Sequence, residues 1–170
     1  MACTQTLAGI ARDCASNRGG IKRVLLANFD DVTAKTVSND IITAITMATS
    51  TKFKEYNFRP QTAALTSTPQ INNENGVSYV QSVLSMAFAK MDTTKRLEIN
   101  AMMLGDLAAI VEDNNGKYWY LGYDDPIKAT GGESGTGTAY GDANRYGIEF
   151  QDNSNLYPYE VNASIISGLL

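Results

Sequence analysis

The chain has 170 residues, of which 44% are apolar and 19% charged, as in ordinary globular domains. Its 14 basic and 18 acidic side chains give a net charge of −4. A dedicated nucleic-acid binder, which needs a basic surface, is therefore not expected. The chain contains no histidine, which excludes histidine-based catalytic triads, most zinc sites and a histidine pH switch.

Residues 1–20 are small and polar and end in Asn17-Arg18-Gly19-Gly20, a pattern that indicates an irregular N-terminal arm followed by a turn. This arm contains both cysteines of the chain, Cys3 and Cys14. The two could close a small disulfide loop, or they could stay free thiols in a reducing cytosol. The arm has neither a basic nor an apolar signal region, so no secretory signal peptide is expected.

Short apolar and β-branched runs predict strands in the next part of the chain. We expect strands at 21–29 and 41–47, bounded by turn residues at Asp30-Asp31 and Asn39-Asp40. A loosely alternating segment follows at 52–59. Each run is short and bounded by polar residues, which is typical of an all-β domain.

Asn75-Gly76 is the strongest hairpin signal in the chain, because a two-residue type I′ turn needs positive φ at both central positions. It predicts a long hairpin with arms at 63–71 and 77–88. Pro69 indicates that the first arm is an edge strand or is broken. The arms exceed the usual ~5–6 residues of a strand, so we expect the hairpin to protrude. One face of its second arm carries Val80, Leu84, Met86 and Phe88.

The segment 92–105 predicts the single helix, with Asp92 or Thr93 as N-cap. Gly105 is placed to end it in the left-handed conformation. A second Asn-Gly turn then predicts a hairpin, and a Gly-rich stretch precedes the last strands. The apolar stripe of the helix comprises Leu97, Ala101 and Leu104, and the remaining strands are expected at 107–112, 117–123, 146–150 and 157–166.

This pattern predicts a mainly β fold, an antiparallel β-sandwich or half-barrel with a long protruding hairpin and one flanking α-helix. We expect an N-terminal arm at 1–20 and a single domain at 21–170, without an internal repeat. The longest apolar run, 107–111, is far below the ~20 residues of a membrane-spanning helix, so no membrane partner is expected.

No motif of the chain carries recognisable catalytic chemistry. The glycines at 131–138 lack the lysine of a Walker motif, because Thr138 stands in its place, and Gly141 falls one position late for a dinucleotide motif. They favour a flexible loop over an anion cradle. The acidic residues Asp30-Asp31, Asp113 and Asp124-Asp125 could act as acid–base groups or bind calcium, but turn hydrogen bonding explains them better.

Aromatic and basic clusters leave two further possibilities open. Tyr118, Trp119, Tyr120 and Tyr123 could stack against sugars or bases, or could belong to the core or a subunit interface. In a strand, Trp119 would face away from its two tyrosine neighbours. The basic side chains Lys52, Lys54 and Arg59 are interrupted by Glu55 and support at most a weak DNA-facing patch. We therefore assign no catalytic, cofactor-binding or metal-binding residue, and we expect no enzyme and no cofactor.

The order of segments resembles that of a known family. A long hairpin, QTAALTSTPQINNENGVSYVQSVLSMAF, leads into the helix TTKRLEINAMMLG, then into LAAIVEDNNGKYWYLGYDDPIKATGG and a Gly-rich loop with GTGTAYGDANRYGIEFQ. These segments are similar to tail tube (major tail) proteins of tailed bacteriophages, particularly of phages that infect Bacteroidetes. The resemblance covers most of residues 20–166.

The resemblance implies a non-enzymatic virion protein, assembled in the host cytoplasm and located in the tail. The protein would bind further copies of itself in stacked, usually hexameric rings, and would contact other tail or connector proteins. Genomic DNA would pass through the lumen without sequence-specific binding. Long hairpins would join edge to edge as an inner β-barrel, while the arm and the Gly-rich loop would bridge rings. The alternatives are a head–tail connector, portal-ring or capsid accessory protein, a tube protein of a type VI or contractile injection system, and a soluble glycan-binding β-sandwich module.

Overall fold

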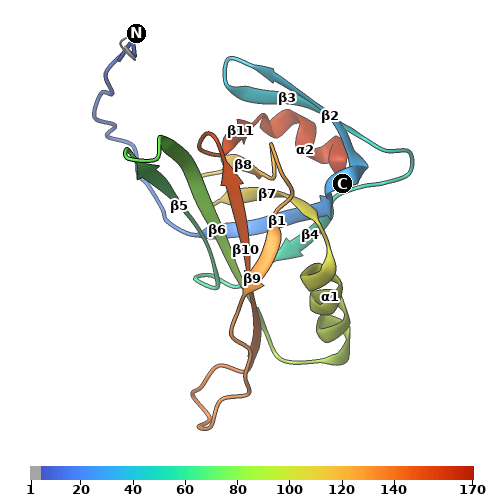
Figure 1. The fold of residues 1–170 in the computed structure, drawn as a ribbon. Coiled ribbons are helices and arrows are strands. Elements are labelled where there is room, and N and C mark those ends of the chain that lie inside the picture. The colour runs from blue at the N-terminus through green and yellow to red at the C-terminus, as the bar shows by residue number, and fades with distance from the viewer. Residues whose placement is uncertain (1–4) are drawn as a thin grey trace.

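The computed structural model describes residues 5–170 and is mainly β, with 48% of the chain in strands and 13% in helices. Two sheets pack face to face, and two helices lie at their margins (Figure 1). The expected mainly β architecture with a flanking helix is thus confirmed. Within the described residues, no helix has the length and apolar character needed to cross a membrane.

The larger sheet has seven strands in the order β2-β3-β11-β8-β7-β1-β4. Its neighbouring strands are antiparallel except for β11 and β3, which run parallel. The mixed pairing is a departure from the purely antiparallel sandwich that the sequence predicts. The strands are β1 (Ile21–Asn28), β2 (Val32–Ser38), β3 (Ile41–Met47), β4 (Lys54–Asn57), β7 (Leu107–Asp113), β8 (Tyr118–Leu121) and β11 (Tyr159–Val161).

The smaller sheet contains the predicted long hairpin, β5 (Ala63–Asn72) and β6 (Val77–Ala89), in the order β5-β6-β10-β9. It is completed by β10 (Arg145–Ser154) and β9 (Lys128–Gly131). Pro69 lies inside β5, which is an edge strand, as proline in a sheet requires. On β6, the buried face carries Val80, Ser82, Leu84 and Met86.

Two apolar clusters hold the layers together. One lies between the sheets and includes Val24, Leu84 and Phe150; the other lies on the far side of the larger sheet and includes Leu25 and Ile110. Strands β1 and β7 contribute to both clusters, because successive side chains of a strand point to opposite faces. This is why their sequences are continuous apolar runs rather than alternating patterns.

Helix α1 (Thr93–Leu104) occupies the predicted segment, and the Asp92 side chain accepts a hydrogen bond from the Lys95 backbone N–H (2.8 Å) as its N-cap. The predicted buried stripe is wrong. Ile99 and Met102 face the core, whereas Leu97 and Leu104 are exposed. Gly105 has φ −87°, so the helix does not end in the left-handed conformation either.

Two elements depart from the expected order. Strand β2 was not expected, and it pairs with β3 through the two-residue turn Asn39-Asp40, in which both residues have positive φ. In place of the end of the expected strand at 157–166, a second helix, α2 (Ala163–Leu169), follows β11 and packs on the larger sheet. In both Asn-Gly pairs the glycine alone, Gly76 or Gly116, has positive φ, so the hairpin at Asn75-Gly76 lacks the predicted type I′ turn.

Candidate functional site

The outer edge of β5 is open, since no strand within residues 5–170 pairs along it. The Ala87 N–H donates to the Thr62 carbonyl (2.9 Å), which fixes the alternation of the antiparallel β5–β6 ladder. From Thr62 onward, even-numbered residues bond to β6 and odd-numbered residues direct their N–H and C=O outward. Pro69, which has no N–H, falls on an outward position. Leu65 and Ser67 therefore present free backbone groups at this edge.

The outer face of the four-stranded sheet is polar and carries few charges. The strand registers place alternate residues of β5, β6, β9 and β10 on this face, opposite the core. Its charged members are Lys128, Arg145 and Glu149. Its uncharged polar side chains include Thr66, Thr68, Gln70, Gln81, Ser85 and Gln151. Such a face offers a passing polyanion few cations to bind.

Residues 5–20 form an extended arm in which every side chain is exposed. Leu7 and Ile10 are 91% and 101% exposed, so no part of residues 5–170 covers their apolar surface. The base of the arm is held against the β7–β8 turn, where the Arg18 N–H donates to the Asn115 side-chain oxygen (2.9 Å). Exposed apolar side chains on an arm that is held at its base are typical of contacts between protein subunits.

Cys14 is exposed, and Cys3, with which it could form a disulfide, lies outside the described residues. The choice between a disulfide and two free thiols stays a prediction.

The Gly-rich stretch is partly a strand and partly a projecting loop. Strand β9 occupies its beginning, and residues 132–144 then extend away from the sheets at the lower end in Figure 1. Gly132 (φ +135°) and Gly147 allow two backbone segments to touch, because a Cβ at either position would overlap backbone atoms. The Asp142 carboxylate accepts hydrogen bonds from the backbone N–H groups of Thr138 and Ala139 (2.8 and 2.7 Å). The turn that it closes presents a fully exposed Tyr140.

The aromatic residues of β8 alternate as predicted. Tyr118 and Tyr120 are buried, at 9% and 1% exposure, in the cluster under α2. Trp119 faces the other cluster and donates its ring N–H to the Asp113 carboxylate (3.1 Å). These three side chains therefore belong to the core and form no exposed stacking platform.

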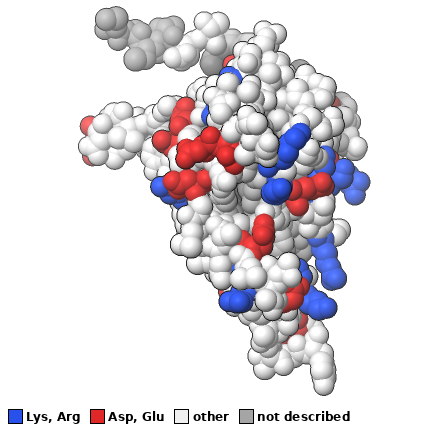
Figure 2. Space-filling view, turned by 90° about the vertical axis from the view of Figure 1, so that its right-hand side faces the viewer, with Lys and Arg blue, Asp and Glu red and all other residues white. Residues whose placement is uncertain are grey.

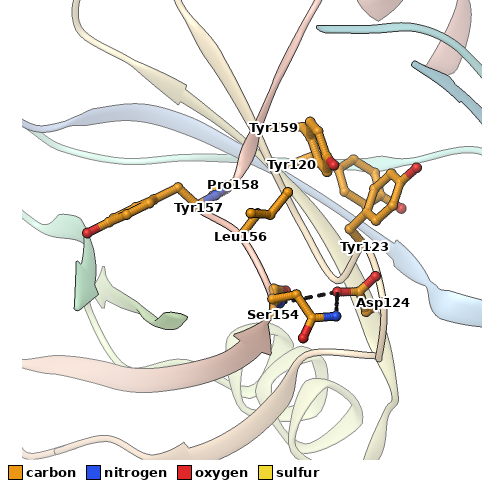
Figure 3. A pocket seen from close by; sticks show the side chains of 9 residues that line it. Tyr120, Tyr123, Asp124, Ser154, Leu156, Tyr157, Pro158 and Tyr159 are labelled. Carbon is orange, nitrogen blue, oxygen red and sulfur yellow. Dashed lines mark hydrogen bonds between the residues drawn. The ribbon is translucent and has the colours of Figure 1, made fainter. Parts of the chain in front are cut away.

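A pocket of about 230 Å³ lies beside this cluster, between the end of β8 and the β10–β11 connection (Figure 3). The rings of Tyr123 and Tyr159 form one wall, with centroids 4.7 Å apart. Next to Tyr123, the Asp124 carboxylate accepts hydrogen bonds from the backbone and side-chain amides of Asn155 (both 3.3 Å). Tyr120 also lines this pocket, and its hydroxyl is buried without a hydrogen-bond partner among the described residues.

Cationic and acidic groups surround the pocket. The Lys35 ammonium donates to the Tyr123 carbonyl (2.8 Å) and lies 4.8 Å from the centre of that ring. Burial lowers the pKa of Lys35. Asp152 is buried nearby, and burial raises its pKa although the Ser154 hydroxyl donates to it (2.9 Å).

Glu112 is the buried carboxylate of a salt-bridge network on the larger sheet. Its side chain is 4% exposed and accepts hydrogen bonds from Lys22 (2.9 Å) and Arg23. Arg23 also contacts Glu55 (3.1 Å) and the Tyr118 hydroxyl (3.2 Å). Burial alone would raise the pKa of Glu112, but the hydrogen bonds from the two cations bring it below its usual value. This network ties β1, β4, β7 and β8 together.

The other candidate residues do not converge on a reactive centre. Asp113 accepts from the N–H groups of Asn115 and Lys117 (2.8 and 2.9 Å), as expected of a turn carboxylate. Within residues 5–170, no three His, Cys, Asp or Glu side chains are grouped as a metal site. On the face shown in Figure 2, Lys and Arg side chains are interspersed with Asp and Glu and form no continuous basic patch.

Comparisons of the chain with protein-family models, with curated proteins and with solved structures find no match. The resemblance to tail tube proteins therefore stays a prediction. Through Pro69 the sequence predicted an edge strand or a break at β5, but the tyrosine pocket was missed, because residues 154–159 include part of a segment predicted to be a strand. Pro158, between two tyrosines, was the signal that the chain turns there.

Proposed function

We propose that this protein is a structural protein of a phage virion that joins copies of itself, sheet edge to sheet edge, into stacked rings forming the tail tube through which DNA passes. The observation that carries the proposal is the unpaired edge of β5, in the long hairpin of a sheet whose outer face is polar and almost uncharged.

The open edge favours assembly because unpaired strand edges readily pair with another chain. The other edge strand of the four-stranded sheet is β9, on its opposite side. The residue before it, Ile127, exchanges two backbone hydrogen bonds with Leu107 (3.2 and 2.9 Å), so the part left to pair with another copy is residues 128–131. Pairing β5 of one copy with β9 of the next is a head-to-tail contact, and such contacts close into a ring when the rotation between copies allows it. The sheets would then form one continuous barrel.

The outer sheet face favours a DNA conduit over a DNA-binding site. In the proposed barrel this face lines the lumen, where threonine, serine and glutamine side chains keep the surface wet. Tight DNA binding requires many cations opposite the phosphates. The strands place two cations, Lys128 and Arg145, and one anion, Glu149, on this face. DNA would therefore pass without being held.

The proposal is tested by replacing Ser67 with proline, which removes an outward N–H from β5. The matched control Ser67→Ala keeps that N–H and loses the same side-chain hydrogen bond, which joins Ser67 to the Ser82 hydroxyl (2.7 Å). We expect rings or tubes, seen by negative-stain electron microscopy, from the wild type and Ser67→Ala but not from Ser67→Pro. Deleting residues 66–82 should likewise leave a folded monomer.

Each alternative outcome has a clear meaning. A wild-type protein that stays an 18.4 kDa monomer at high concentration would contradict self-assembly. Normal rings from Ser67→Pro would show that β5 is not the joining edge. Single rings that never stack would favour a connector over a tube.

A further inference from the structure

We propose that copies of this protein stack by inserting Tyr140 of one copy into the tyrosine pocket of the next; this contact rests on the proposed function. The pocket is the one lined by Tyr120, Tyr123, Asp124 and residues 154–159. Projection and pocket are thus on the same chain, and each copy supplies one of each.

The two features lie at opposite ends of the molecule. The loop bearing Tyr140 precedes β10, and the pocket-lining segment follows β10. The strand has 10 residues, so it separates the two by about 33 Å at the ~3.3 Å rise of a β residue. A projection at one end and a recess at the other make a contact that repeats along an axis instead of closing a pair.

The pocket fits an aromatic ring with a polar tip. Its volume of about 230 Å³ is below the ~300–1,000 Å³ of sites for drug-sized ligands, which leaves room for one ring. Tyr123 and Tyr159 offer aromatic faces, against which a third ring can pack edge-to-face. Asp124, in the lining, can accept a hydrogen bond from the phenol of such a ring.

The charges around the pocket also select an uncharged occupant. Lys35 already lies against the rings of Tyr120 and Tyr123, so a second cation there would be repelled. Asp124 and the buried Asp152 repel an anion. The loop apex at 135–141 carries no charged side chain, and the Asp142 carboxylate is bonded to its own turn.

The projecting tyrosine is already held in position for such a contact. Asp142 closes the turn around it, and Tyr140 leaves its whole ring in solvent. A fully exposed ring on an ordered turn contributes nothing to the fold of its own copy, while burial in a partner's pocket recovers its apolar surface.

The test compares stacking in four variants by light scattering and electron microscopy. Tyr140→Ala should still form rings but need a roughly tenfold or higher protein concentration to stack, because aromatic anchors dominate such interfaces. Tyr140→Phe should weaken stacking less than Tyr140→Ala, since it removes only the contact of the hydroxyl group. Leu156→Trp, at an exposed position on the pocket wall, should block stacking as Tyr140→Ala does. The control Leu104→Ala truncates an exposed residue of α1 and should stack normally.

The outcomes separate this inference from the proposed ring. Tyr140→Ala tubes that form like those of the wild type would overturn the stacking contact and leave the ring intact. Stacking lost in Tyr140→Ala but unchanged in Leu156→Trp would refute the pocket as the partner. If wild-type rings never form, the contact still predicts concentration-dependent chains of copies that Tyr140→Ala abolishes, and a strictly monomeric wild type refutes both proposals.

Discussion

The buried carboxylate of Glu112 allows a quantitative test of how the larger sheet is held together. Replacing Glu112 by Gln keeps its size but removes the charge that Lys22 and Arg23 face. Breaking a buried ion pair from one side costs about 3–5 kcal/mol. Here Arg23 keeps Glu55 and the Tyr118 hydroxyl as partners, so we expect a smaller loss of about 2–3 kcal/mol.

The predicted loss is measurable by thermal unfolding. For a chain of this size each kcal/mol lowers the Tm by about 2–4 °C, so Glu112→Gln should lower it by about 4–12 °C at pH 7. The control Glu55→Gln removes the more exposed partner of Arg23, and its effect should stay below about 1 kcal/mol.

The pH dependence of stability tests independently whether ionised Glu112 stabilises the folded state. Because the pKa of Glu112 is lowered in the folded state, the unfolded chain takes up the proton first as the pH falls. The stabilisation is therefore complete above the ordinary glutamate pKa of ~4.3 and is lost as the pH drops through the lower, folded-state value. The difference in Tm between the wild type and Glu112→Gln should therefore become smaller as the pH falls. A variant as stable as the wild type at pH 7, or a gap that widens in acid, would refute the reasoning.

Two further variants test local features of the fold. Burial raises the pKa of Asp152, so the folded state binds the proton more readily than the unfolded state, and the ionised group destabilises the fold at neutral pH. Asp152→Asn should therefore raise the Tm at pH 7, with an advantage that shrinks as the pH falls; an unchanged or lower Tm at pH 7 would contradict this. Gly132→Ala should destabilise the fold by about 2 kcal/mol or more, because its φ of +135° is strained for alanine and its Cβ would overlap the Gly147 carbonyl. Gly135→Ala, whose Cβ would meet nothing, is the matched control, and equal urea midpoints for the two variants would disprove the close contact.

Local signals predicted the positions of the strands well where turn chemistry and alternation agreed. The Asn-rich turn between β5 and β6 and the alternation of β6 were enough to identify the hairpin from the amino-acid sequence. Pro69 predicted an edge strand or a break, and β5 is an edge strand; proline has no backbone N–H, so it fits where no neighbouring strand needs that donor. Asp92 identified the start of α1, because a carboxylate caps the free N–H groups of a helix.

The errors arose where tertiary packing decided between locally equivalent options. Helix α1 has apolar residues on two faces, and the sheets cover Ile99 and Met102 instead of the Leu97 stripe. Strand β2 is mostly exposed, so its sequence lacks the apolar alternation of a half-buried strand. The segment after Tyr157 is β-branched enough to suggest a strand, yet Asn162 caps a helix there through the Ser164 N–H (3.0 Å).

Strand β11 has a consequence for how the chain folds. It lies between β3 and β8, so the β2–β3 hairpin joins the rest of its sheet through this three-residue strand. Every other strand in the described part of the chain precedes it, and β3 is more than 110 residues away in sequence. During synthesis, the β2–β3 hairpin therefore cannot join the remaining strands of the larger sheet until residues 159–161 have left the ribosome. We expect its closure to be a late and slow step, since pairing between distant segments must first overcome the entropy of the long intervening loop.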